Sequence, residues 1–330
     1  MSDPLLAIRD LHVTYATGDG PLPAVRGVDV TVDRGQIVGV AGESGCGKST
    51  LASTVLRLQP PSAQVSGEVL VNGRDVLTMR WGELRAVRWA GASIVFQGAL
   101  HSLNPVHRVG TQIAEPLRIH QPTLGEARIR GRVAELLDQV GLDPDRARSY
   151  PHQLSGGQKQ RIMIAMALAC DPELVVADEP TTALDVMVQA QVLDVLTELV
   201  RRRGVGMMMI SHDLSVLAHL CDRITVMYAG RVVEEGAAEQ VFARPLHPYA
   251  GALSAAFPRI GDPAARFAPS GLPGDPPDPR NLPGGCSFAP RCPRAADVCL
   301  PAEPELTPYA EGRAAACVRV GEPDTTEVAS

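Results

Sequence analysis

The stretch at residues 42–50, GESGCGKST, constrains the fold of this chain more than any other part of it. It follows a short β-branched apolar run, Gln36–Ala41, and leads into a helical pattern over Leu51–Leu58. Between a strand and a helix, such glycines let backbone N–H groups and the helix N-terminus surround phosphate groups. The sequence therefore predicts a nucleotide-binding loop.

Two side chains of this loop have distinct expected roles. Lys48 is placed to reach the β- and γ-phosphates, and the Ser49 hydroxyl to ligate Mg²⁺. The loop positions predicted to bind ATP are Gly42, Ser44, Gly45, Cys46, Gly47, Lys48, Ser49 and Thr50.

The pattern around the loop predicts an α/β fold with a P-loop core. Further strands are expected at Ala7–Tyr15, Val28–Val32, Ser66–Asn72, Ala92–Phe96, Leu174–Ala177, Val205–Ile210 and Arg223–Met227. Helical spacing dominates an insert at about 98–172 and returns at Met187–Arg202. Alternating strands and helices favour a largely parallel or mixed sheet. The expected domains are 1–257, which holds the nucleotide core, and 258–330, a separate loop-rich extension in which the segment Pro258–Pro308 contains 13 of the 28 prolines.

Two acidic residues end the predicted strand LVVADE at 174–179. Asp178 would lie at the carboxyl edge of the sheet beside the phosphate loop, where it can hold Mg²⁺. Glu179 is the next residue and points elsewhere, which suits a general base that polarises the attacking water.

A second anion-binding pattern, LSGGQ at 154–158, opens a helix. One nucleotide does not need two such cradles in one chain. The presence of a second anion-binding pattern suggests that each nucleotide is shared between two subunits. One subunit would then contribute Ser155, Gly156, Gly157 and Gln158 in trans.

These three motifs, in this order and spacing, resemble the ATP-binding subunit of an ATP-binding-cassette (ABC) transporter over residues 5–255. The resemblance implies an ATPase whose two subunits form a head-to-tail dimer that closes on ATP and opens after hydrolysis. It also implies further site residues: Tyr15 on adenine, Gln97 on Mg²⁺ and water, Asp185 at the dimer interface, and His212 on the γ-phosphate.

Several stretches resemble the branch of importers for oligopeptides, dipeptides and nickel. They include His247-Pro248-Tyr249 and Pro290-Arg291-Cys292-Pro293, while Gly98 and Ala99 depart from the usual pattern. This resemblance implies two transmembrane permease subunits, an extracytoplasmic substrate-binding protein and a second ABC ATPase, expected to be a related, different chain. Whether the ATPases are identical, and which substrate is carried, stays open.

Composition bears on the partners and the location. The net charge is −6 and no extended basic surface is visible, so nucleic acid is not an expected ligand. The N-terminal stretch lacks a signal-peptide pattern, and the longest apolar run, Ile162–Cys170, is too short to span a bilayer. A peripheral position on the cytoplasmic face of the membrane is expected. The alternatives to an importer function are a soluble ABC ATPase that acts on ribosomes or DNA, and the ATPase subunit of an ABC exporter.

Four of the seven cysteines lie in the extension, spaced C-x₅-C-x₆-C-x₁₇-C. In a reducing compartment a ligand set is more plausible than disulfides. The loose spacing favours a [4Fe–4S] cluster over zinc, with free thiols as a third possibility, and the predicted ligands are Cys286, Cys292, Cys299 and Cys317. Of the other cysteines, Cys46 is expected to have a lowered pKa near a helix N-terminus, and Cys170 and Cys221 to be buried.

Overall fold

The computed structural model describes residues 3–96, 102–181, 184–256 and 274–321. Gln97, which is expected to contact Mg²⁺ and water, lies outside the described residues. So do Gly98 and Ala99, the two positions that depart from the usual importer pattern.

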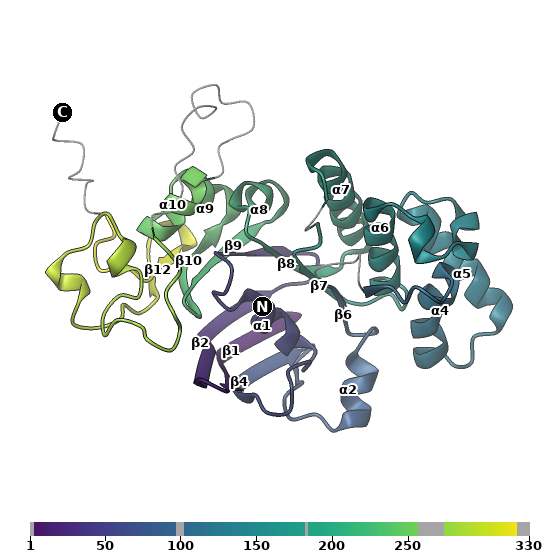
Figure 1. Cartoon of the computed structure of the whole chain (residues 1–330), viewed down its shortest axis with the longest axis horizontal. Helices are drawn as coiled ribbons and strands as arrows, with labels where there is room; N and C mark the ends of the chain where they lie inside the picture. The colour runs from purple at the N-terminus through teal and green to yellow at the C-terminus, as the bar shows by residue number, and fades with distance from the viewer. Residues whose placement is uncertain (1–2, 97–101, 182–183, 257–273, 322–330) are drawn as a thin grey trace.

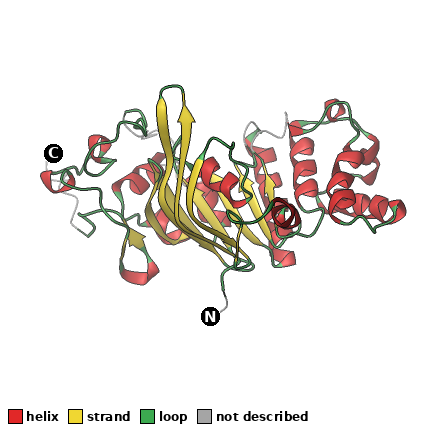
Figure 2. Ribbon diagram, turned by 90° about the horizontal axis from the view of Figure 1, so that it is seen from below, coloured by secondary structure: helices red, strands yellow, loops and turns green. Residues whose placement is uncertain are grey.

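An eight-stranded sheet forms the centre of the molecule, in the order β11-β12-β10-β9-β3-β8-β7-β6 (Figures 1 and 2). Its strands β9, β3, β8, β7 and β6 run parallel, whereas β10, β12 and β11 are antiparallel to their neighbours. Their bounds are β3 Ile37–Ala41, β6 Ala92–Val95, β7 Leu174–Asp178, β8 Gly206–Ser211, β9 Arg223–Tyr228, β10 Arg231–Ala237, β11 Thr307–Pro308 and β12 Ala314–Ala315. The mixed sheet predicted from the sequence is confirmed.

A second, antiparallel sheet packs near the first, in the order β2-β1-β4-β5. It consists of β1 Leu6–Thr17, β2 Gly20–Val32, β4 Gln64–Val71 and β5 Arg74–Asp75. Strand β3 is buried on both faces because its side chains alternate between two cores: Val38 and Val40 join the core under the antiparallel sheet, and Ile37 and Ala41 join the opposite one. This double burial explains why the strand before the phosphate loop is an uninterrupted apolar run.

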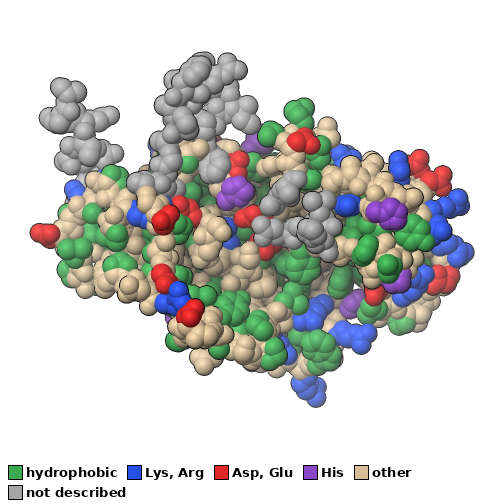
Figure 3. Space-filling model, in the orientation of Figure 1, with side chains coloured by type: hydrophobic (Ala, Val, Ile, Leu, Met, Phe, Trp, Pro, Cys, Tyr) green, Lys and Arg blue, Asp and Glu red, His purple; other side chains and the backbone are tan. Residues whose placement is uncertain are grey.

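Helices α4 Val109–His120, α5 Glu126–Gln139 and α6 Gly156–Ala167 lie between β6 and β7 in the chain and form one end of the molecule (Figures 1 and 2). Figure 3 shows basic and acidic side chains intermixed at this end. One such pair, Arg118 with Glu126, joins α4 to α5 at 2.8 Å. The helical insert expected at about 98–172 therefore has helices where the spacing predicted them.

The remaining helices connect or flank the strands of the main sheet. They are α1 Lys48–Val55, α2 Trp81–Val87, α7 Val186–Arg203, α8 Leu214–Leu220, α9 Ala238–Ala243 and α10 Pro248–Ala256. Helix α7 ends at Gly204, which adopts the left-handed conformation, and three arginines occupy its last turn. No described helix combines the length and the apolar character that a bilayer span requires.

The described part of the extension, residues 274–321, is rich in loops and 3₁₀ turns, as predicted. It is not separate from the core, however. Strand β12 pairs with β10, and Phe288 is 1% exposed within the larger hydrophobic core. The expectation of a separate appendage is wrong here because the extension uses the core's apolar surface and sheet edge instead of building its own.

Candidate functional site

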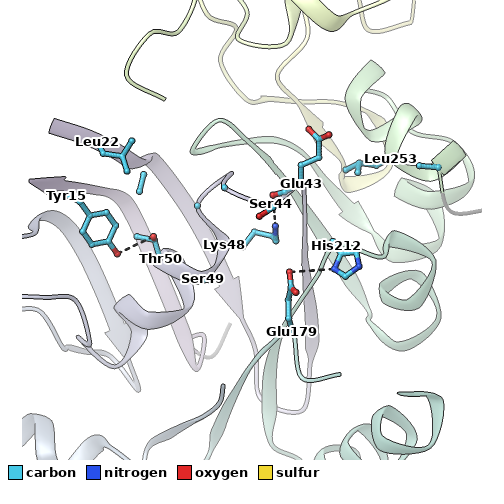
Figure 4. A pocket seen from close by; sticks show the side chains of 14 residues that line it. Tyr15, Leu22, Glu43, Ser44, Lys48, Ser49, Thr50, Glu179, His212 and Leu253 are labelled. Atoms are coloured by element: carbon cyan, nitrogen blue, oxygen red, sulfur yellow. Dashed lines mark hydrogen bonds and ion pairs between the residues drawn. The ribbon is translucent and has the colours of Figure 1, made fainter. Parts of the chain in front are cut away.

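A cavity of about 660 Å³ opens above the carboxyl end of β3 (Figure 4). That volume suits a nucleotide-sized ligand. Residues from both sheets, the phosphate loop and α10 line it: Tyr15, Leu22, Ala24, Glu43, Ser44, Gly45, Gly47, Lys48, Ser49, Thr50, Glu179, His212, Leu253 and Ala256. Most of the loop positions predicted from the sequence meet here.

Two glycines of the loop are required by their surroundings. Gly47 has φ +105°, and a Cβ on it would lie 2.3 Å from the carbonyl oxygen of Ala24. Gly42 has φ +152°, and its Cβ would lie 2.4 Å from the carbonyl oxygen of Met227. Side chains at either position would push the loop away from strands β2 and β9, so the glycines let the backbone curl tightly.

Lys48 lies at the floor of the loop with only 5% of its surface exposed. Its ammonium group donates hydrogen bonds to the carbonyl oxygens of Gly42 at 2.7 Å and Glu43 at 2.8 Å. The loop therefore folds around a nearly buried positive charge, which faces the same cavity as Ser49.

Ser49 and Asp178 meet where α1 begins and β7 ends. The Ser49 hydroxyl donates to a carboxylate oxygen of Asp178 at 3.1 Å, and Asp178 is 7% exposed. Burial raises the pKa of Asp178, while the hydrogen bond from Ser49 opposes that rise. A hydroxyl and a desolvated carboxylate at this distance form an oxygen donor pair that fits Mg²⁺.

Glu179 has a left-handed backbone with φ +43°, which is uncommon for a residue other than glycine. Its N–H donates to the carbonyl of Ile210 at 3.1 Å, which ties the end of β7 to β8. Its carboxylate lies 3.7 Å from Nδ1 of His212, just beyond β8 (Figure 4). The neighbouring Glu179 carboxylate raises the pKa of His212. The sharp turn after Asp178 thus lets two consecutive carboxylates meet different partners.

The outer wall of the cavity is less polar. The Tyr15 hydroxyl donates to the Thr50 hydroxyl at 3.3 Å, which leaves the half-buried ring along the cavity (Figure 4). Sequence reasoning missed Leu22, Ala24, Leu253 and Ala256. The His-Pro-Tyr triplet at the start of α10 was the available signal for the last two, but it indicated a family and not a wall of the site.

The LSGGQ residues begin α6 and do not line this cavity. Ser155 caps the helix: its hydroxyl accepts from the N–H of Gln158, and its own N–H donates to the Gln158 side chain at 3.1 Å. Gly157 packs so closely on α7 that an added Cβ would lie 2.4 Å from Cγ1 of Val188. Asp185 caps α7 through the N–H of Val188. Ser155, Gly156, Gln158 and Asp185 therefore lie at the surface where α6 and α7 begin, while Gly157 is buried against α7.

The burial and the pKa of Cys46 differ from those predicted from the sequence. Its side chain is 5% exposed and does not line the cavity, and burial raises the pKa of the thiol. The predicted lowering of its pKa is wrong because desolvation outweighs the nearby Lys48 charge. Cys170 and Cys221 are buried, as expected.

The four extension cysteines line one cavity together with His247 and Phe288. Burial raises the pKa of the Cys286, Cys292 and Cys317 thiols, and neighbouring backbone N–H groups oppose that rise. Within the described ranges, no three or more His, Cys, Asp or Glu side chains already have the arrangement of a metal site.

Comparisons with known proteins agree with this geometry. Residues 25–182 match the ABC transporter family, and residues 233–299 match the oligopeptide/dipeptide transporter C-terminal region. The oligopeptide transport ATP-binding protein OppD of Salmonella typhimurium is 44% identical, with 96% of this chain and 93% of that protein covered. OppD of Mycobacterium tuberculosis is 46% identical, but the chain spans only 52% of its length, about half.

Solved structures give the same result. A dimeric bacterial ABC transporter cassette matches with a TM-score of 0.64 and 29% identity, over 71% of this chain and 98% of that one. The cbiO1 subunit from Clostridium perfringens matches with a TM-score of 0.63 and 30% identity, over 74% and 92%. The chain therefore belongs to the ATP-binding subunits of ABC transporters, in the branch with the oligopeptide/dipeptide transporter C-terminal region.

Proposed function

We propose that this protein binds and hydrolyses ATP to power the import of peptides through separate membrane subunits. The observation that carries the proposal is a single cavity lined by Lys48, Ser49, Glu179 and His212, in which Ser49 is hydrogen-bonded to Asp178 and Glu179 is paired with His212. A phosphate binder, a cation site and a base with a titratable neighbour are the parts that phosphoryl transfer to water requires.

Each part has a definite task in this proposal. Lys48 exchanges its bonds to the loop carbonyls for the β- and γ-phosphates of ATP. Ser49 and Asp178 would hold Mg²⁺, which would neutralise charge on the phosphate oxygens. Glu179 accepts a hydrogen bond from the attacking water, and His212 contacts the γ-phosphate. Gln97 would add a contact to Mg²⁺ and water, and Tyr15 would stack on adenine.

We further propose that two such subunits form the head-to-tail dimer implied by the family. Ser155, Gly156, Gly157, Gln158 and Asp185 all lie outside the chain's own cavity, which supports a role against the nucleotide of a partner. A backbone-rich helix N-terminus suits that task. The proposed partners are a second, related ATPase, two permeases and an extracytoplasmic binding protein, at the cytoplasmic face of the membrane. We also propose that the cassette ends at residue 257.

Co-purification and transport test this function together. Affinity capture of the full chain from membranes is expected to bring down two multispanning proteins, and the reconstituted assembly should take up a peptide only with ATP. Capture with ribosomes or DNA, without the membrane proteins, would overturn the importer assignment. ATP-dependent uptake of Ni²⁺ in place of peptide would select the nickel importer of the same branch.

For the extension we propose that Cys286, Cys292, Cys299 and Cys317 bind a [4Fe–4S] cluster, with zinc as the alternative. The common cavity supports this set, and the backbone N–H groups beside three of the sulfurs favour the thiolate form that a metal requires. Binding would require the thiols to close in on the metal. Anaerobic purification should give a brown protein that contains iron and sulfide; a colourless protein with stoichiometric zinc would select zinc, and neither metal would overturn the site.

A further inference from the structure

A buried ion pair links the cysteine-containing extension directly to the phosphate loop. The Arg291 guanidinium donates to both carboxylate oxygens of Glu43, at 2.7 and 2.9 Å. The Arg291 side chain is 7% exposed and that of Glu43 21%. Bidentate, charge-assisted hydrogen bonds fix the relative orientation of the two side chains as well as their distance.

Tyr249 makes an independent connection to the same loop residue. The N–H of Glu43 donates to the Tyr249 hydroxyl at 2.8 Å. The Tyr249 ring packs against Phe288 of the extension with ring centroids 5.3 Å apart, and Tyr228 contacts both rings. Glu43 is therefore held through its backbone by α10 and through its side chain by the extension.

The position of Glu43 matters because the residue also contacts Lys48. Its carbonyl oxygen accepts a hydrogen bond from the Lys48 ammonium, and it lines the nucleotide cavity. In Figure 4 its carboxylate points away from Lys48, on the side that Arg291 occupies. Without Arg291, an uncompensated negative charge would remain beside the site that must accept a polyphosphate. Coulomb repulsion at the edge of a partly desolvated cavity then opposes ATP binding.

We propose that Arg291 is a positioning residue of the ATP site, through which the extension sets the affinity of the phosphate loop for ATP. This inference rests on the proposed ATP binding. Arg291 directly precedes Cys292, a residue of the four-cysteine cavity, so a rearrangement of that cavity moves the loop contact. Because coupling between sites is reciprocal, bound nucleotide also stabilises the segment around Cys292.

The test measures the dissociation constant of the full-length chain for a Mg²⁺ complex of a non-hydrolysable ATP analogue. Arg291→Met is expected to weaken binding about tenfold. Glu43→Gln in the same chain removes the unpaired charge, so the double variant should recover to within about threefold of wild type. Arg291→Lys, which keeps the charge, should lie between. The control Arg280→Met removes another extension arginine, whose partners Asp278 and Asp19 are both solvent-exposed, and should bind normally.

Two further readouts separate positioning from general destabilisation. In the assembled transporter, Arg291→Met should raise the KM for ATP while kcat changes by less than about twofold. Hydrogen exchange of backbone amides at 286–292 should slow when the analogue binds to wild type, and not in Glu43→Gln.

The outcomes distinguish this inference from the proposed function. Normal affinity in Arg291→Met, or a double variant weaker than Arg291→Met alone, overturns the positioning role and leaves ATP binding intact. If wild type itself fails to bind the analogue, or Lys48→Ala binds as tightly as wild type, the proposed function fails first.

Discussion

Nδ1 of His212 lies 3.7 Å from a carboxylate oxygen of Glu179, so the ends of β7 and β8 are joined by a titratable pair at the base of the nucleotide cavity. The pair combines a carboxylate that is 17% exposed with an imidazole that is 59% exposed. Water reaches the histidine more readily than the carboxylate. The state of the pair can therefore follow the pH of the solution.

The first prediction concerns the pKa of His212. Its interaction with the Glu179 carboxylate raises that pKa above the ordinary 6.5, so Glu179→Gln should lower it toward 6.5. The stabilising contact is fully present below 6.5 and is lost as pH rises through the raised pKa. NMR titration of the histidine ring in the full chain measures both values. An unchanged pKa in Glu179→Gln would show that the pairing is absent in solution.

Loss of the proposed base should stop hydrolysis without preventing ATP binding. Glu179→Gln is expected to reduce turnover by about 10²–10⁴-fold, because the amide cannot accept the proton of the attacking water. ATP-bound dimers should then accumulate, as seen by size-exclusion chromatography. Glu173→Gln is the matched control, since Glu173 precedes the same strand and its side chain is 44% exposed. Wild-type turnover in Glu179→Gln, assayed with its partners, would refute the assignment.

The contact between α6 and α7 gives a stability prediction. Gly157→Ala should destabilise the protein by about 1–3 kcal/mol, because the added Cβ would lie 2.4 Å from Val188. Val188→Ala in the same chain should recover most of that loss. Gly131→Ala on α5 is the control: nothing lies within 4 Å of its Cβ, so it should stabilise by about 0.5–1 kcal/mol. Denaturant unfolding measures all three, and equal effects of the two glycine changes would contradict the packing.

A second buried ion pair attaches the extension to the sheet. Arg313 donates to Glu234 at 2.7 Å, and the side chains are 6% and 0% exposed. Arg313→Met should cost about 3–5 kcal/mol because it leaves a buried carboxylate with one partner fewer. Combining it with Glu234→Gln should restore part of the loss. Arg223→Met breaks the half-exposed pair with Glu235 and should cost less than about 1 kcal/mol. Thermal unfolding ranks the variants, and equal losses would contradict the burial argument.

The parts of the site that the sequence predicted are those encoded by short contiguous patterns. Lys48 and Ser49 follow from a glycine loop between a strand and a helix, and Asp178 and Glu179 from a strand that ends in carboxylates. Their convergence follows from the parallel sheet, which brings the carboxyl ends of β3, β7 and β8 to one edge.

The remaining features depend on contacts that sequence patterns do not record. Arg291 and Glu43 are 248 positions apart, and neither lies in a periodic element that would relate them. The direction of the Cys46 side chain could not be predicted either. In a loop whose φ angles alternate in sign, side chains do not point in the regular directions that they have in a helix or a strand. The pairing of β12 with β10 involves only two residues of each strand, too few for any detectable alternation.

That short pairing also bears on solubility. Strand β10 would otherwise offer its backbone N–H and C=O groups to another chain, the usual route to edge-to-edge aggregation. With β12 and β11 added, the outermost strand on that side has two residues, and one of them is Pro308, which has no N–H to donate. The extension thus ends this side of the sheet with a two-residue strand that offers few backbone groups for pairing with another chain.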